Sequence, residues 1–288
     1  MNPNLQGALL MMGSMAAFTM NDVFVKLLAE TVPLFQIVFL RGVMTTVLLA
    51  ATVAAFGKLT FRIPRGDRAK VALRTVFEVL TVVTFLTALV NMELANATAI
   101  LAALPLVVTL GAALLFKEPV GWRRWTAIAV GASGVFLIVQ PGTAGFNAYS
   151  LLALVAVFLV AGRDLSTRAF SNQVPLMSIA VLTAASVGAF GGIMSLTIEW
   201  VPMTGREIAY LAGSALFIIG GYVLSIFVMR VGDVAVTSPF RYTALVFALI
   251  LGVVVFAEFP NALALTGAAI VVATGVFTLI RERQVARG

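Results

Sequence analysis

Charged side chains are scarce in the apolar stretches of this sequence, and the few that occur there are the residues best suited to bind a ligand or another charge. They are Asp22, Lys26, Arg41, Arg74, Glu78, Arg163, Asp164, Arg168 and Arg241. Uncharged polar residues in similar positions are Asn21, Asn96, Gln140, Tyr222 and Tyr242. A charge in apolar surroundings is costly, so it faces other polar groups, water or a ligand. We expect these side chains to pair and to bind.

The residue types that are missing exclude most enzyme chemistry. The chain has no Cys and no His, which excludes disulfides, His-based metal sites and the Ser-His-Asp and Cys-His forms of catalysis. It has no G-x-x-x-x-G-K-[ST] run to bind ATP phosphates. An intramembrane enzyme would need paired acids or a lone Ser or Lys, and the G-x-G-D run of membrane aspartyl proteases is absent. We therefore expect a protein that is not an enzyme and that has no cofactor and no metal site.

The composition is that of a membrane protein. The 288 residues are 61% hydrophobic and 11% charged, whereas a soluble domain is about 45–50% apolar and about 25% charged. A helix that crosses a bilayer needs about 20 apolar residues. Ten such stretches occur, at residues 5–28, 33–56, 70–91, 94–116, 122–140, 148–168, 175–198, 207–230, 234–256 and 261–281. A soluble enzyme, a nucleic-acid binder and a disordered chain are excluded, and we predict an all-α protein of ten transmembrane helices in a lipid bilayer.

Alternate loops carry the positive charge. The cations on one side are Lys58, Arg62, Arg65, Arg68, Lys70, Lys117, Arg123, Arg124, Arg168, Arg230, Arg281, Arg283 and Arg287. The loops of the other side offer Arg206, beside Glu199 and Glu207. Because cytoplasmic loops are rich in Lys and Arg, both termini are predicted to be cytoplasmic. These loops also account for the net charge of +7 without a nucleic-acid partner. The first residues lack a basic region and a cleavage site, so the first stretch is expected to be retained in the bacterial inner (cytoplasmic) membrane.

The two halves of the sequence resemble each other. At an offset of 142 residues, Asp22 corresponds to Asp164, Lys26 to Arg168, and Ile37 to Ile179; at an offset of 140, Glu93 corresponds to Asp233 and Glu118 to Glu258. Each half has five apolar stretches, so the second half must enter the membrane from the opposite side. We predict two inverted repeats, residues 1–142 and 143–288. Inverted repeats are frequent in secondary transporters, which bind substrate near the midplane between the halves.

Two charge pairs have helical spacing. Asp22 and Lys26 are four residues apart, as are Asp164 and Arg168, so each pair shares a helix face. The inverted repeat puts the first pair toward the outside and the second toward the cytoplasm. The pairs fit alternating gates, and they equally fit ordinary intrahelical pairs near helix ends, which contribute only about 0.3–0.5 kcal/mol.

Arg41 and Glu78 are the charged residues expected to lie deepest in the membrane. Arg41 is about 12 Å from the outer end of its stretch, and Asp22 is its expected counter-ion; attraction of a substrate carboxylate is the alternative. The repeat position of Arg41 holds Thr183, so this cation has no counterpart in the second half. Glu78, with Arg74 four residues before it, is a candidate for proton coupling, and Asp22 is the other candidate. Arg163 joins these residues as a candidate for substrate binding or gating.

Three further features concern the fourth and ninth stretches. Arg241 and Tyr242, early in the ninth stretch, are predicted to form a polar collar at the cytoplasmic mouth. Pro105 and Pro239 lack an N–H and free backbone carbonyls, so each is predicted to kink its helix beside the substrate path.

Several motifs resemble a known family. They are Phe39-Leu40-Arg41-Gly42, the junction Phe116-Lys117-Glu118-Pro119 with Trp122, the run that begins Gly131-Ala132-Ser133-Gly134, and the second junction Phe256-Ala257-Glu258. They are similar to motifs of the ten-helix EamA-type branch of the drug/metabolite transporter superfamily, along essentially the whole chain. Members of that branch include exporters of aromatic amino acids and carriers of riboflavin or S-adenosylmethionine.

This resemblance implies a secondary transporter of small metabolites. Export of amino acids or related amphipathic compounds is the first expectation, and uptake of a vitamin or nucleoside-like metabolite is the second. A proton or a counter-substrate is the expected coupling partner, while the oligomeric state is left open. A passive channel and an intramembrane enzyme are the contrasting classes.

Overall fold

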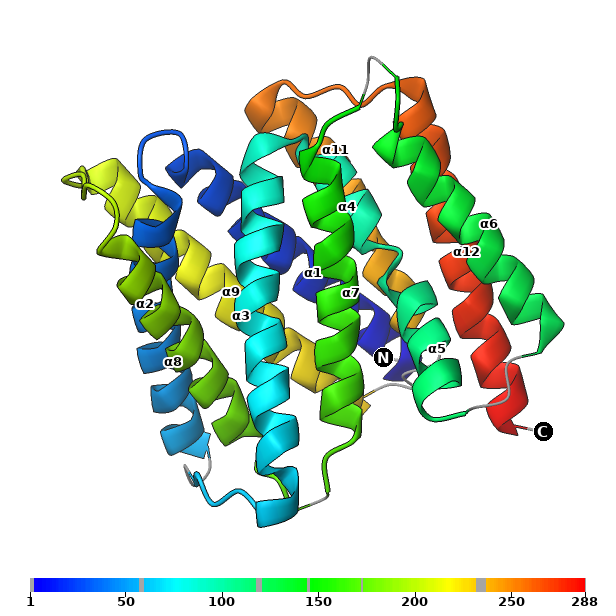
Figure 1. Cartoon of the computed structure of the whole chain (residues 1–288), viewed down its shortest axis with the longest axis horizontal. Coiled ribbons are helices and arrows are strands. Elements are labelled where there is room, and N and C mark those ends of the chain that lie inside the picture. The colour runs from blue at the N-terminus through cyan, green and yellow to red at the C-terminus, as the bar shows by residue number, and fades with distance from the viewer. Residues whose placement is uncertain are drawn as a thin grey trace.

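The computed structural model describes residues 3–56, 60–117, 121–143, 146–171, 173–231 and 237–287, and all regular structure in these ranges is helical (Figure 1). The long helices of the first half are α1 (Pro3–Leu28), α2 (Leu34–Phe56), α3 (Arg68–Asn91), α4 (Leu94–Leu101), α5 (Leu104–Leu115) and α6 (Trp122–Val139). Those of the second half are α7 (Tyr149–Arg168), α8 (Leu176–Ser195), α9 (Gly205–Val231), α11 (Thr243–Phe256) and α12 (Ala262–Arg287). Two 3-10 helices, η1 (Arg65–Asp67) and η2 (Ser238–Tyr242), precede α3 and α11.

The described helices supply the predicted membrane crossings. Eight helical segments are long and apolar enough to span a bilayer, and two shorter apolar helices, Trp125–Val139 and Ala262–Thr278, supply the remaining two crossings. Helices suit this environment because they satisfy every backbone hydrogen bond internally, which lipid cannot do. The prediction of an all-α, ten-helix membrane protein is therefore confirmed.

The fourth crossing is interrupted, whereas the sequence predicts one continuous stretch. α4 ends at Leu101, a turn of two residues follows, and α5 starts with Pro105 in its first turn. Proline is tolerated there because a first-turn N–H has no partner within the helix. The ninth crossing changes from η2, which contains Pro239, to α11 between Tyr242 and Thr243. At the 140-residue offset, this change coincides with the turn at residues 102–103.

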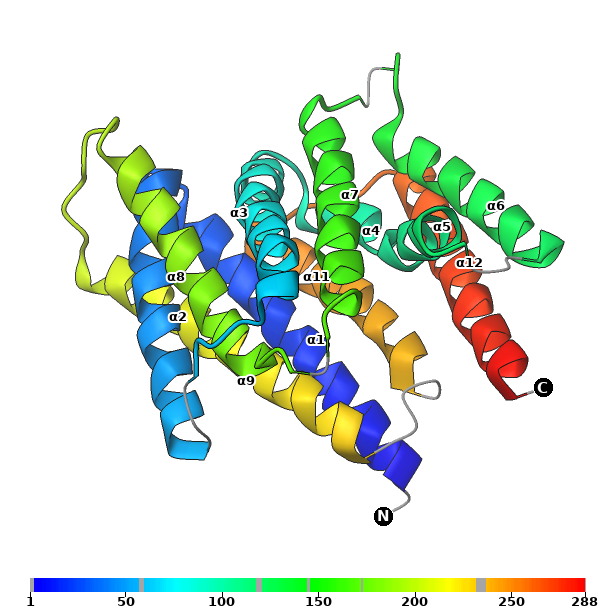
Figure 2. The ribbon, with the colours of Figure 1, turned by 60° about the horizontal axis from the view of Figure 1, so that its bottom comes forward.

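The helices pack in pairs that each join one half of the chain to the other. The closest pairs are α1 with α9, α3 with α7, α2 with α8, and α6 with α12, and the views in Figures 1 and 2 agree on this arrangement. If the halves are exchanged, α1–α9 becomes α7–α3, while α2–α8 and α6–α12 map onto themselves. This is the pairing that an approximate two-fold axis between two five-crossing halves requires.

Glycines let the paired helices approach closely. A Cβ atom built on Gly42 of α2 would lie 2.4 Å from the Cα atom of Gly188 on α8. One built on Gly134 of α6 would lie 2.8 Å from the carbonyl oxygen of Gly267 on α12. Both approaches are backbone to backbone, so a larger residue cannot be accommodated by a side-chain rotation.

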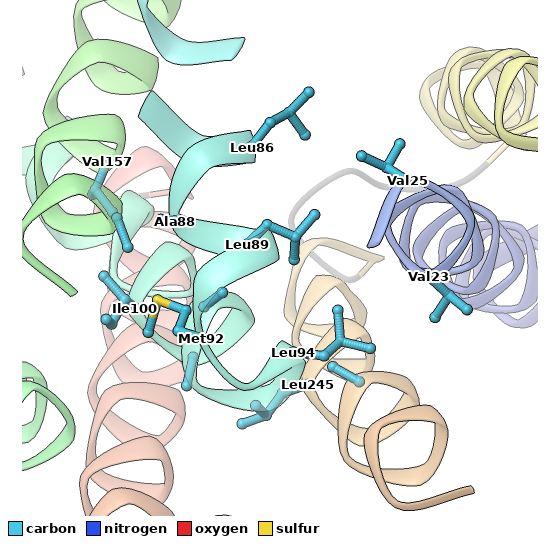
Figure 3. Close-up of a cluster of buried hydrophobic side chains, with 14 of the residues drawn as sticks. Val23, Val25, Leu86, Ala88, Leu89, Met92, Leu94, Ile100, Val157 and Leu245 are labelled. Carbon is cyan, nitrogen blue, oxygen red and sulfur yellow. The ribbon is translucent and has the colours of Figure 1, made fainter. Parts of the chain in front are cut away.

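The main hydrophobic core lies toward the end of the bundle predicted to face outside. It includes Val25 near the end of α1, Leu89 near the end of α3, Leu94 at the start of α4 and Val157 in α7, and Figure 3 shows these side chains on their separate helices. Toward the cytoplasmic end the described buried clusters are small, such as the one formed by Met11, Met15 and Val228. Most of the described buried apolar side chains therefore gather toward the outer end.

Candidate functional site

An ion pair at membrane depth joins the two halves. The Nη1 atom of Arg163 on α7 lies 3.1 Å from Oε2 of Glu78 on α3, and its Nη2 atom lies 2.9 Å from Oδ1 of Asp164. The side chains of Glu78 and Arg163 are 14% and 24% exposed. Three predicted site residues therefore meet. Glu78 has its ion pair with Arg163 of the other half, whereas the sequence suggested Arg74 of its own helix.

Arg74 reaches across to the second half as well. Its Nε atom donates to Thr167 Oγ1 at 3.0 Å on α7, and its Nη1 atom donates to Thr183 Oγ1 at 2.6 Å on α8. Thr183 occupies the repeat position of Arg41. The second half supplies no cation of its own at that position, as the sequence indicates, but α3 of the first half places the guanidinium of Arg74 against it. Sequence alignment of the repeats cannot show this, since the cation comes from a different helix.

Asn21 separates Asp22 from Arg41. Its Nδ2 atom donates to Asp22 Oδ1 at 2.9 Å, and its Oδ1 atom accepts from Arg41 Nη1 at 3.2 Å. Arg41 is 6% exposed and Asn21 is 4% exposed. Within the described residues, no carboxylate lies within 4.0 Å of a nitrogen of Arg41. Asp22 attracts the guanidinium electrostatically without the direct ion pair that the sequence suggested.

Tyr222 of α9 lies among these groups. It interacts electrostatically with Glu78, Arg163, Arg74 and Arg41, which come from three other helices. Its ring meets that of Phe18 edge to face, with centroids 5.4 Å apart. Tyr222 is nevertheless 40% exposed, so part of this polar region keeps accessible surface. We name the following residues the central cluster: Asn21, Asp22, Arg41, Arg74, Glu78, Arg163, Asp164 and Tyr222.

A second charged group, the outer cluster, consists of Lys26, Glu93, Asn96 and Glu258. Lys26 forms a salt bridge with Glu258 and donates to the carbonyl oxygen of Met92. The other carboxylate oxygen of Glu258 accepts from the backbone N–H of Leu94 at 2.7 Å, where α4 begins. A carboxylate at a helix N-terminus is favourable because the unpaired N–H groups there carry partial positive charge.

Asn96 and Glu93 complete the outer cluster. Asn96 donates to Glu93 Oε2 at 2.8 Å. Burial, together with the neighbouring carboxylate of Glu258, raises the pKa of Glu93 above its ordinary value, against the opposing effect of Lys26. Lys26 and Asn96 are therefore not part of the central cluster, and the predicted Asp22–Lys26 pair is wrong because Lys26 turns toward the second half. Sequence reasoning missed Glu258 as its partner, although its recurrence with Glu118 was the available signal.

The predicted collar of Arg241 and Tyr242 is not formed as expected. Arg241 is exposed on η2, whereas Tyr242 is buried against α12, where a Cβ atom built on Gly275 would overlap its hydroxyl group. The two side chains therefore face different surroundings. Arg168 lies over the ring of Phe116, 5.4 Å from its centroid. Glu118 and Asp233, which the repeat singled out, lie outside the described residues.

Comparisons with known proteins agree with this architecture. The sequence pattern of the EamA-like transporter family matches residues 5–140. The S-adenosylmethionine uptake transporter of Rickettsia felis is 26% identical over 94% of this chain and 91% of its own length. The riboflavin transporter of Rhizobium johnstonii is 26% identical over 73% of this chain and 70% of its own. The pseudopaline exporter CntI of Pseudomonas aeruginosa is 24% identical over 92% of this chain and 93% of its own length.

The fold is also found in a solved structure. One protein crystal structure, with 20% sequence identity, superposes on 96% of this chain and 98% of its own chain with a TM-score of 0.67. The solved structure supports the fold alone. The relatives that match along nearly their full length are named as transporters of small molecules. The first half of the chain thus matches the EamA-like transporter family, transporters of small molecules are similar to nearly the whole chain, and its apolar helices are those of a multi-pass protein of the bacterial inner membrane.

Proposed function

We propose that this protein is a secondary carrier that takes up S-adenosylmethionine or a closely related metabolite by alternating access between its two halves. The observation that carries the proposal is the central cluster, in which residues of α1, α2 and α3 meet residues of α7 and α9 at membrane depth. Charged groups at this depth are costly and mark substrate or ion pathways. A site at the boundary of inverted repeats is reached from either side as the halves rock.

The relatives support the choice of substrate. Full-length relatives are named for uptake of S-adenosylmethionine, while a shorter match is named for riboflavin and another full-length one for export of pseudopaline. Export of amino acids is the second candidate, because an amino acid carries the same zwitterionic group as S-adenosylmethionine. Both candidates suit a site that presents Arg41 and Asp22 on either side of Asn21.

The packing favours a state open toward the cytoplasm. The main core and the outer cluster lie at the end predicted to face outside, and both connect helices of opposite halves. To admit substrate from outside, the carrier must separate Lys26 from Glu258 and part the helices around Leu89 and Leu94. We propose that binding of a proton or a counter-substrate to the central cluster shifts the carrier between the state open to the cytoplasm and the state open to the outside.

A ligand-stabilisation screen tests the substrate. The full chain, purified in detergent, is heated with S-adenosylmethionine, riboflavin, tryptophan or adenosine, and the midpoint of unfolding is recorded. A ligand at about 100 times its Kd stabilises the folded state by about 2.7 kcal/mol. We expect S-adenosylmethionine to raise the midpoint most. A larger increase with riboflavin, or no increase with any of the four, contradicts the proposed substrate.

A further inference from the structure

The guanidinium group of Arg41 has fewer partners than its burial demands. It carries five N–H donors and is 6% exposed, yet its single hydrogen bond within the described residues is the one to the neutral amide oxygen of Asn21, at 3.2 Å. A buried charge of this kind is strongly destabilising unless an anion satisfies it. The remaining donors of Arg41 are thus available to a carboxylate that the described residues do not supply.

Asp22 is the complementary group beside it. Its carboxylate accepts from Asn21 at 2.9 Å, and within the described ranges no Lys or Arg nitrogen lies within 4.0 Å of it. Asn21 uses its carbonyl for Arg41 and its amide for Asp22, so it holds an anion and a cation apart while orienting both. Two opposite charges kept separate in this way match a ligand that carries both charges itself.

The second half shows the same positions closed by protein groups. Residues 163 and 164 correspond to Asn21 and Asp22, and there Arg163 binds both Asp164 and Glu78. The guanidinium at the position equivalent to Arg41 is that of Arg74, which is held by Thr167 and Thr183. Because of this asymmetry, Asp22 and Arg41 are the pair that still has hydrogen-bonding groups available to a ligand.

Aromatic rings adjoin this pair. Phe18 precedes Asp22 by one helical turn on α1, so both lie on the same face. Its ring contacts Tyr222, whose side chain retains accessible surface. Such rings suit the planar or apolar body of an amphipathic ligand.

We infer that Arg41 and Asp22 form the subsite for a zwitterionic aminoacyl head group, with the carboxylate of the ligand on Arg41 and its ammonium group on Asp22. This inference rests on the proposed carrier function and adds the chemistry by which the site selects its substrate. Asn21 positions both charges, and Phe18 with Tyr222 contacts the rest of the ligand.

Pairs of ligands that differ in one charge test the subsite. Binding to the full chain in detergent is measured by calorimetry for S-adenosylmethionine, for tryptophan and for the methyl ester of each, which lacks the negative charge. A hydrogen-bonded charge pair corresponds to about a ten- to hundredfold change in affinity. We expect the wild type to prefer each acid over its ester by this factor, and Arg41→Gln to bind acid and ester within about threefold, having lost that charge pair.

Two variants separate binding from folding. Arg41→Lys keeps the charge without the planar fork and should keep part of the preference for the acid. Asp22→Asn should keep the acid-over-ester preference while losing discrimination against the des-amino analogue of tryptophan. Variants are compared only after gel filtration gives the wild-type profile.

The outcomes distinguish the subsite from the carrier function. Full acid-over-ester discrimination in Arg41→Gln overturns the subsite. Failure of the wild type to bind either acid overturns it too, and transport of riboflavin by that same protein would show that the carrier function stands.

Discussion

The ammonium group of Lys26 is bound to the carboxylate of Glu258, which lies 232 residues further along the chain. The same lysine lies over the ring of Phe256, 5.0 Å from its centroid. The second half repeats this relationship, with Arg168 over Phe116. Lys117 and Ala257, which follow the two phenylalanines, both have a left-handed φ of 53°. The two junctions therefore share a left-handed residue after the phenylalanine, at opposite ends of the bundle.

The first prediction concerns the stability of the closed outer end. Glu258→Gln removes the negative charge beside Lys26, a partly buried group that then lacks its counter-ion. We expect the free energy of unfolding to fall by about 3 kcal/mol, and a Cys introduced at Leu89 to become more reactive toward a water-soluble maleimide. Glu30→Gln, at an exposed position near the same end, is the control and should change neither quantity. Unaltered reactivity in Glu258→Gln would show that this ion pair does not keep the outer end closed.

The second prediction concerns the pH dependence of stability. The pKa of Glu93 in the folded chain is raised above its unperturbed value of 4.5, so between these two values the folded chain binds more protons than the unfolded chain. The stability contributed by this group therefore decreases as pH rises through that window. Glu93→Gln should flatten this slope and raise the unfolding midpoint at neutral pH, measured by thermal unfolding in detergent. If the unfolding midpoint of Glu93→Gln falls more steeply with rising pH than that of the wild type, the prediction is wrong. Glu199→Gln, at an exposed position, serves as the control.

The third prediction separates two carboxylates in the membrane. Glu78 is held in an ion pair with Arg163, whereas Asp22 has no such partner within the described residues. Asp22 is therefore the carboxylate left available to a coupling proton. We expect Asp22→Asn to abolish the pH dependence of uptake in proteoliposomes.

Its counterpart, Glu78→Gln, should lower stability by about 2–3 kcal/mol at neutral pH, less than a fully buried pair because both side chains keep some exposure. Uptake should retain its pH profile. The assignment is reversed if Glu78→Gln loses the pH dependence and Asp22→Asn keeps it.

Sequence reasoning succeeded where one strong physical constraint acts along the chain. Apolar stretches of about 20 residues have few alternatives to membrane helices, so the number of crossings could be read directly. The recurrence of Asp22 at Asp164 and of Lys26 at Arg168 likewise follows from the repeat. The boundaries 1–142 and 143–288 remain a prediction.

Partners across the bundle could not be read in the same way. Local spacing favours Asp22 as the partner of Lys26, but a long flexible side chain takes whichever carboxylate the packing brings near, and that is Glu258. Arg163 reaches Glu78 because α3 packs on α7, an arrangement that helical periodicity does not encode. The turn at residues 102–103 shows that Pro105 starts a new helix, where a kink was predicted.

The fourth prediction concerns helix packing. Gly42→Ala places a methyl group against the backbone of Gly188, and overpacking of this kind costs about 1–3 kcal/mol. Gly220→Ala is the matched control, because a Cβ atom there meets nothing within 4 Å. The unfolding midpoint should fall in the first variant and stay level or rise in the second. Equal midpoints would mean that α2 and α8 can separate at little cost.

The fifth prediction concerns orientation. The chain has no native Cys, so a single introduced thiol reports its own side of the membrane. Gly66→Cys should react with an impermeant reagent only from the cytoplasm, and Thr143→Cys only from outside. The opposite pattern would invert the topology and, with it, the side on which the outer cluster lies.

Counterflow in proteoliposomes tests the carrier mechanism most directly. Vesicles that contain the purified chain are loaded with unlabelled S-adenosylmethionine and diluted into a trace of the labelled compound. A carrier that alternates between two faces should give saturable entry, with labelled substrate rising transiently above its equilibrium level. Entry that is linear in concentration and unaffected by the internal load would contradict alternating access and indicate a passive pore.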